Sequence, residues 1–195
     1  MDRPELGATI AGVGAGVVAF GMGLLLAAAL VLTNQERLQA GLPPRTDLHA
    51  TELVAWTFYS AHFVGLTGPN HAAFGENIAV FAVTGATPSV LLVYLIPPVS
   101  LVLAGFFASA WVPDQRSSAD TLFVVCSRIG VGYGVTALLG AVTIRMQLDL
   151  IMRPDPGYTI VLMAIAYPVV FAGLGTLLAV ITRASRWAPT PQVSR

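Results

Sequence analysis

The chain of 195 residues contains no lysine, a single cysteine and few charges of either sign. Charged residues make up 10% of the sequence, whereas soluble domains carry about 25%, so a water-facing surface could not be covered. This excludes a soluble globular enzyme and a disordered chain. The ten basic residues are all arginines and are balanced by ten acidic residues. The sequence therefore contains no polybasic patch, and we expect no nucleic acid partner.

The single cysteine, Cys126, allows neither an internal disulfide nor a cysteine metal cluster, and we interpret it as a small buried apolar residue. What the chain has in excess is hydrophobic residues, at 55% of the sequence, with a mean hydropathy of +0.75. An integral membrane protein is the class that remains, with the lipid bilayer as its main partner.

Four apolar runs are long enough to cross a bilayer, which takes about 20 helical residues. They lie at about 8–33, 87–111, 121–144 and 157–182. A signal peptide is the alternative for the first run, but its flank MDRPELG is not basic and the run is longer than a signal core. The sequence therefore predicts an all-α, polytopic transmembrane helix bundle. We expect a single membrane domain, with an extramembrane or interfacial segment at 34–86 and a tail at 183–195.

The segment 34–86 is too long for a turn and too aromatic for a linker. Residues 53–75 carry no charge and could form a fifth span, but their polar side chains and the Gly68-Pro69 pair suit hydrocarbon poorly. The alternative is an interfacial or re-entrant segment, with aromatic side chains such as that of Trp56 at headgroup depth. We favour the interfacial or re-entrant arrangement.

The distribution of arginines orients the chain, because cytoplasmic flanks carry the excess of basic residues. With four spans, one side holds both termini and the larger group, which comprises Arg3, Arg116, Arg183, Arg186 and Arg195. The other side then holds Arg37, Arg45, Arg145 and Arg153. Both the four-span and the five-span versions predict a multi-pass protein of the plasma membrane with a cytoplasmic C-terminus. With four spans, the segment 34–86 faces outward.

Small residues recur at spacings of four along the first span and appear again in the third. They let helix backbones approach closely, which is how helices associate in lipid. The glycines concerned are Gly12, Gly16, Gly23, Gly130 and Gly134. We interpret them as packing contacts within one chain, with homo-oligomerisation through the first helix as the alternative.

Prolines interrupt two of the predicted spans. The Pro97-Pro98 pair removes two backbone donors and disfavours helix before it, which predicts a kink or break at mid-membrane in the second span. Pro168 interrupts the fourth span in the same way. Neighbouring helices or hydroxyl groups must then satisfy the carbonyls that the prolines leave free.

Arg128 is the only charge well inside a predicted span. A charge at the bilayer centre costs about 2.5–3.5 kcal/mol on insertion scales, so such a residue usually faces a partner or water. Glu52 or Glu76 could supply a carboxylate, and the carbonyls freed before Pro97 are a neutral alternative. Three interpretations stay open, namely a structural tie, a snorkelling arginine, and a substrate or anion site.

The three histidines, His49, His62 and His71, all lie in the segment 34–86, together with Glu52 and Glu76. Imidazole and carboxylate groups bind zinc and other transition metals, and the H-x-x-E pattern at 49–52 places two of them on one helical face. A metal site is therefore one hypothesis. Since no H-E-x-x-H pattern occurs, we favour solvated or hydrogen-bonded histidines and expect no cofactor and no catalytic residue.

The string W-T-F-Y-S-A-H-F-V, from Trp56 to Val64, follows a glycine-rich first span and a short polar loop. In a chain without lysine, this string resembles small polytopic membrane proteins of haloarchaea, a family without an established activity. The resemblance implies an archaeal plasma membrane and adds no catalytic residue.

We expect a non-enzymatic role. The first hypothesis is a structural or accessory membrane protein whose outward aromatic segment packs at the lipid interface or engages a partner, either another membrane subunit or a second copy. The second is a small transporter or channel that uses Arg128 and the proline-broken helices. The third is an intramembrane metalloenzyme that uses the histidines and glutamates of the segment 34–86.

Overall fold

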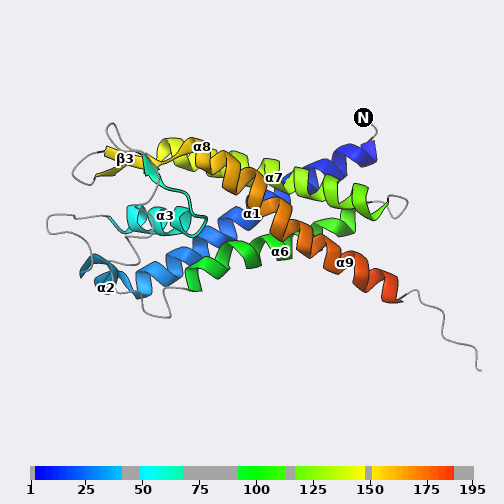
Figure 1. Ribbon diagram of the computed structural model, residues 1–195, viewed down its shortest axis with the longest axis horizontal. Coiled ribbons are helices and arrows are strands. Elements are labelled where there is room, and N and C mark those ends of the chain that lie inside the picture. Colours follow the sequence, from blue (N-terminus) through cyan, green and yellow to red (C-terminus); the bar gives the residue numbers. More distant parts are fainter. Residues whose placement is uncertain (1–2, 41–48, 68–91, 113–116, 148–150, 187–195) are drawn as a thin grey trace, which may run out of the picture.

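The computed structural model describes residues 3–40, 49–67, 92–112, 117–147 and 151–186. These residues are mainly helical, as the sequence predicts, and the long helices pack as a bundle (Figure 1). In chain order, the first helices are α1 (Arg3–Thr33), α2 (Gln35–Ala40), α3 (Ala50–Ser60), η1 (Leu92–Leu95), α6 (Ile96–Ala108) and η2 (Ser109–Trp111). They are followed by α7 (Ser118–Thr143), α8 (Pro156–Tyr158), η3 (Thr159–Ala166), η4 (Pro168–Ala172) and α9 (Gly173–Arg186).

Four helical stretches are long and apolar enough to cross a membrane. They are Glu5–Thr33, Leu92–Trp111, Ala119–Thr143 and Pro156–Arg183. Each coincides with a run predicted from the sequence, although the predicted residues 87–91 lie outside the described part of the chain. The agreement follows from composition, because runs of this length without charges have few other stable environments.

The outward faces of these four spans are apolar. Large hydrophobic side chains are exposed along them, including Leu25 at 73% and Phe123 at 75%. Several exposed hydroxyl groups donate to carbonyls three or four residues earlier in their own helix. They belong to Thr9, Thr33, Ser127, Thr143 and Thr182. An apolar surface whose hydroxyls are satisfied internally suits hydrocarbon, so the chain is an integral membrane protein with several spans.

Contacts between the helices fix their directions. Gly12 of α1 faces Arg128 of α7, and Phe20 contacts Tyr133 further along both helices, so α1 and α7 run parallel. Helices α6 and α9 are parallel to each other and run the opposite way (Figure 1). We call end A the end of the bundle at which α1 and α7 begin and α9 stops, and end B the opposite end.

Glycines allow the backbones of α1 and α7 to touch. A Cβ on Gly16 would meet the carbonyl oxygen of Ile129 and would lie 2.7 Å from the backbone nitrogen of Tyr133. The other glycines singled out from the sequence also lie at contacts within the chain. Gly12 faces Arg128, Gly23 faces Phe58, and Gly130 and Gly134 both face Ala164 in the last span. These close approaches set the distance between the helices.

The prolines lie where a helix tolerates them. Pro97 and Pro98 fall in the first turn of α6, next to the 3₁₀ turn η1. The first four amide groups of an α-helix have no partner within it, and the chain changes from 3₁₀ to α geometry at this pair. At Pro168 the chain remains helical and adopts the wider π geometry of η3 and η4, which commonly accompanies a missing helical donor.

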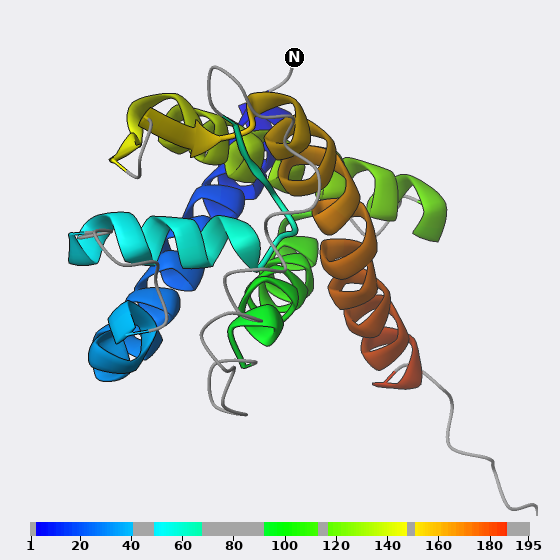
Figure 2. The same ribbon diagram turned by 60° about the vertical axis from the view of Figure 1, so that its left-hand side comes forward.

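Helix α3 does not span the membrane. It is 11 residues long, or about 16 Å, and a turn at residues 61–63 follows it. A continuous helical span over 53–75, the alternative that the absence of charge allowed, is therefore not formed, because α3 ends at Ser60. Helix α3 crosses α1 (Figure 2), and its residue Phe58 packs against α1 at Gly23.

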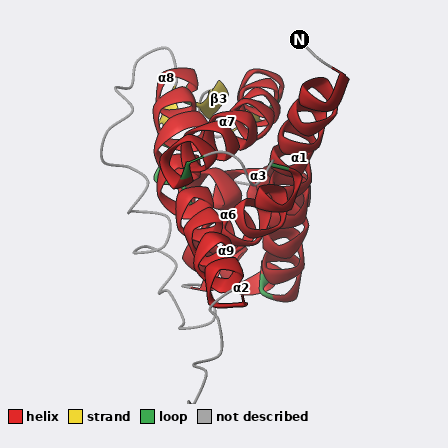
Figure 3. Cartoon of the chain, turned by 90° about the vertical axis from the view of Figure 1, so that its right-hand side faces the viewer, coloured by secondary structure: helices red, strands yellow, loops and turns green. Residues whose placement is uncertain are grey.

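After the turn the chain joins a small antiparallel sheet that the sequence did not indicate. The strands are β1 (Leu66–Thr67), β2 (Met146–Gln147) and β3 (Ile151–Pro154), in the order β1-β3-β2. Leu66 pairs with Pro154 and Thr67 with Arg153. Strands β2 and β3 lie between the C-terminus of α7 and the start of α8 (Figure 3). Residues 49–67 thus enter and leave the bundle at end B, and we call them the re-entrant segment.

Alanine substitutions at Gly16 and Gly14 test the crossing of α1 and α7. A Cβ at position 16 would collide with backbone atoms that cannot move aside, so we expect Gly16→Ala to lower the free energy of unfolding by about 1–3 kcal/mol. No described atom outside its own helix lies within 4 Å of a Cβ on Gly14. Alanine there favours helix by up to about 1 kcal/mol, so Gly14→Ala should preserve or raise stability. Thermal unfolding in detergent compares the two variants, and equal effects would contradict this packing.

Candidate functional site

The inner end of α3 carries a group of buried polar side chains, which includes Tyr59, Ser60 and His62. The helix ends in a Schellman motif, in which the amide of Phe63 donates to the carbonyl of Ser60 (2.9 Å) and that of Val64 to the carbonyl of Tyr59 (3.1 Å). Phe63 has a φ of 58°, in the left-handed region where glycine is usual. For a residue with a Cβ this conformation costs about 1–2 kcal/mol, so surrounding contacts must hold it.

Two side chains satisfy carbonyls at this helix end. Nδ1 of His62 lies 2.8 Å from the carbonyl oxygen of Phe58, and the hydroxyl of Tyr167 donates to the carbonyl of Ala61 at 3.1 Å. Because a carbonyl only accepts, Nδ1 of His62 carries the proton. In a neutral ring Nε2 is then an acceptor, and we assign the hydroxyl of Tyr133, 2.6 Å away, as its donor.

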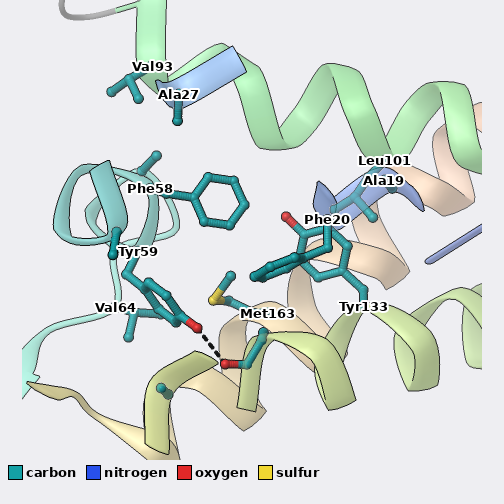
Figure 4. Close-up of a cluster of buried hydrophobic side chains, with 14 of the residues drawn as sticks. Ala19, Phe20, Ala27, Phe58, Tyr59, Val64, Val93, Leu101, Tyr133 and Met163 are labelled. Atoms are coloured by element: carbon teal, nitrogen blue, oxygen red, sulfur yellow. Dashed lines mark hydrogen bonds between the residues drawn. The ribbon is translucent and has the colours of Figure 1, made fainter. Parts of the chain in front are cut away.

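A third hydrogen bond ties α3 to the neighbouring span. The hydroxyl of Tyr59 donates to the carbonyl of Ala137 in α7 (Figure 4). Aromatic contacts complete the packing. The ring of Phe58 meets that of Phe20 in α1 edge to face at 5.1 Å, and the rings of His62 and Tyr167 are 4.9 Å apart. The inner end of α3 therefore contacts α1, α7 and the last span together.

The cluster is buried and electrically neutral. Tyr59, His62 and Tyr133 have no solvent exposure, and Tyr133 lies about 15 Å inside the end of α7 at the rise of a helix. Burial lowers the pKa of His62 below its ordinary value, because desolvation penalises the charged imidazolium. Burial likewise raises the pKa of Tyr59. The His62 ring therefore stays neutral around pH 7 and makes its hydrogen bonds in that form.

The other histidine and glutamate candidates do not join this cluster. His49 is exposed at the start of α3, where its backbone amide donates to the Glu52 carboxylate at 2.9 Å. His62 lies at the opposite end of the same helix. His71 and Glu76 fall outside the described residues. Within the described ranges, no group of three His, Cys, Asp or Glu side chains is placed to hold a metal ion.

Arg128 lies on the half of α7 nearer end A and is half-buried. Its aliphatic stem packs against α1, since a Cβ on Gly12 would lie 2.7 Å from Cβ and 3.0 Å from Cδ of Arg128. Glu52, one of the carboxylates considered for it from the sequence, lies at end B and caps α3. The aromatic cluster and Arg128 are therefore two separate features on α7.

The sequence pointed to His62 and to the phenols of Tyr133 and Tyr167 separately, but it did not join the histidine to the two tyrosines. Tyr133 is 71 residues from His62 in the chain, and neither tyrosine belongs to a motif. The available signal was a phenol in each of two apolar spans, where a hydroxyl group requires a partner.

Comparison with known proteins decides the family. A family model described as a family of unknown function (DUF7978) matches residues 2–183. The chain belongs to DUF7978. The matched range includes the four spans of this DUF7978 chain and its re-entrant segment. No curated protein and no solved structure matches the chain. The geometry described above is therefore the basis for any function assigned to it.

Removing one hydroxyl group tests the His62–Tyr133 bond. Tyr133→Phe keeps the ring but leaves Nε2 of buried His62 without its donor, so we expect the free energy of unfolding to fall by about 1–3 kcal/mol. In a His62→Leu background the same substitution should cost clearly less, because no acceptor remains. Unfolding of the four variants in detergent measures this coupling. Additive effects of the two substitutions would show that the bond does not stabilise the fold.

Proposed function

We propose that this DUF7978 protein is a structural or accessory protein of the archaeal plasma membrane, with a cytoplasmic C-terminus and no enzymatic activity. The observation that carries the proposal is that His62 uses both ring nitrogens within the chain, one with Phe58 and one with Tyr133. A general base, a metal ligand or a transport residue needs a lone pair or a proton that faces its substrate. His62 instead stabilises the position of the re-entrant segment through these two hydrogen bonds.

The burial of the aromatic string limits which residues could meet a partner. Residues 53–62 are buried within the chain, so the string as a whole does not form an outward surface. Phe63, however, is 59% exposed and stacks on Tyr94 at the start of the second span, with ring centroids 5.5 Å apart. His49 is exposed as well. We propose that another membrane subunit contacts the protein at end B, beside these two positions of the re-entrant segment.

Photo-crosslinking in native membranes tests this proposal. A photoreactive amino acid at position 63 or 49 is expected to give an adduct with the same protein partner. The matched control is position 25, where Leu25 is 73% exposed in the first span and lipid adducts are expected instead. Lipid adducts alone at all three positions would contradict an accessory role at end B.

A small transporter or channel is the second candidate, and one observation favours it. The indole nitrogen of Trp56 and the hydroxyl of Ser60, one turn apart on α3, are buried without a hydrogen-bond partner among the described residues. Each unsatisfied buried group costs about 1–3 kcal/mol, and a polar solute or water would remove that cost. Flux of small neutral solutes into proteoliposomes that Ser60→Ala reduces would support this candidate. Flux equal to that of protein-free liposomes would exclude it.

A further inference from the structure

The half of α7 nearer end A carries the charged residue Arg128, and the contacts between α1 and α7 define its surroundings. Arg128 lies level with Gly12, and Gly132 lies level with Val13, whose backbone a Cβ on Gly132 would meet. Helices α1 and α7 are therefore in contact at this level and parallel. Any group on α1 that meets the guanidinium must lie near Gly12 along the helix axis.

The stem of Arg128 shows which way its guanidinium extends. Its Cβ, Cγ and Cδ atoms all lie within 3.4 Å of the position that a Cβ on Gly12 would take. Gly12 thus leaves the space along α1 that the stem fills. Side chains on a helix lean toward its N-terminus, and the N-terminus of α7 is at end A. The guanidinium therefore lies on the end A side of Gly12.

Glu5 is the acidic residue of α1 that lies in this direction. It precedes Gly12 by two helical turns, which places it on nearly the same face of α1 and about 10 Å closer to end A. The first candidate span begins at this residue. Asp120 is the other described carboxylate near end A, but it accepts a hydrogen bond from the Ser117 hydroxyl at 2.6 Å in the first turn of α7.

We propose that Glu5 and Arg128 form an ion pair that joins α1 to α7 near the end A surface of the membrane. The pair supplies the opposite charge that an arginine inside a span requires. It also fixes the register of α1 on α7, because the stem of Arg128 must lie across Gly12 for the charges to meet. Arg128 is then a tie between two spans, and this role is independent of the partner contact proposed at end B.

A double-mutant cycle tests the pair in the full-length protein. Glu5→Gln is expected to lower the Tm in detergent by about 5 °C, because it leaves Arg128 without its counter-charge. In an Arg128→Met background, Glu5→Gln should change the Tm little, since no charge remains to be paired. Glu36→Gln is the matched control, because Glu36 is an exposed carboxylate in α2, which follows the other end of α1, and it should have no effect in either background.

Charge reversal gives a second readout if a single variant fails to fold. Glu5→Arg combined with Arg128→Glu is expected to restore folding and most of the Tm lost in either single variant. Equal effects of Glu5→Gln in the wild-type and Arg128→Met backgrounds, or failure of the reversed pair to recover any Tm, would overturn the proposal.

Discussion

The hydrogen bonds of His62 are the interaction on which the re-entrant segment depends. A helix that ends inside an apolar bundle leaves carbonyl groups that water cannot reach, and each must find a partner in the protein. Nδ1 of His62 donates to the carbonyl of Phe58, and Nε2 accepts from the hydroxyl of Tyr133. The hydroxyl of Tyr167 satisfies a second carbonyl of this helix end, that of Ala61, and the hydroxyl of Tyr59 joins α3 to the carbonyl of Ala137 in α7. Together they explain how a short helix remains among longer spans.

Close packing of the spans makes those hydrogen bonds possible. Gly16 brings the backbone of α1 against that of α7, and Gly23 leaves room for the ring of Phe58. Because these approaches fix the distance between α1 and α7, the hydroxyl of Tyr133 reaches the ring of His62. Lipid gives no hydrophobic drive to helix association, so geometry of this kind and a few polar ties must define the structure.

Composition was sufficient to predict the four spans and the all-helical class, because charge-free runs of the necessary length have few other uses in a protein. It also favoured a short interfacial or re-entrant segment, since the polar residues after Leu53 suit a hydrocarbon-spanning helix poorly. The ending of α3 at Ser60 agrees with that interpretation. Composition also singled out Arg128, because it is a charged residue inside a predicted span, where charges are rare.

Other features depend on contacts that are distant in sequence. The pairing of His62 with Tyr133 and the three short strands have no local pattern that could reveal them. The H-x-x-E pattern at His49 and Glu52 suggested a metal site as one hypothesis. In the structure the Glu52 carboxylate accepts a hydrogen bond from the His49 amide at the start of α3, as in a helix capping box.

The re-entrant path of residues 49–67 is tested most directly by cysteine accessibility across a sealed membrane. In a Cys126→Ser background, single cysteines replace His49, Thr67 and Ser117, and each is exposed to a membrane-impermeant thiol reagent from either side. For a re-entrant segment, positions 49 and 67 are expected to react from one side and position 117 from the other. Reaction of positions 49 and 67 from opposite sides would show that the segment crosses the membrane and would contradict the re-entrant path.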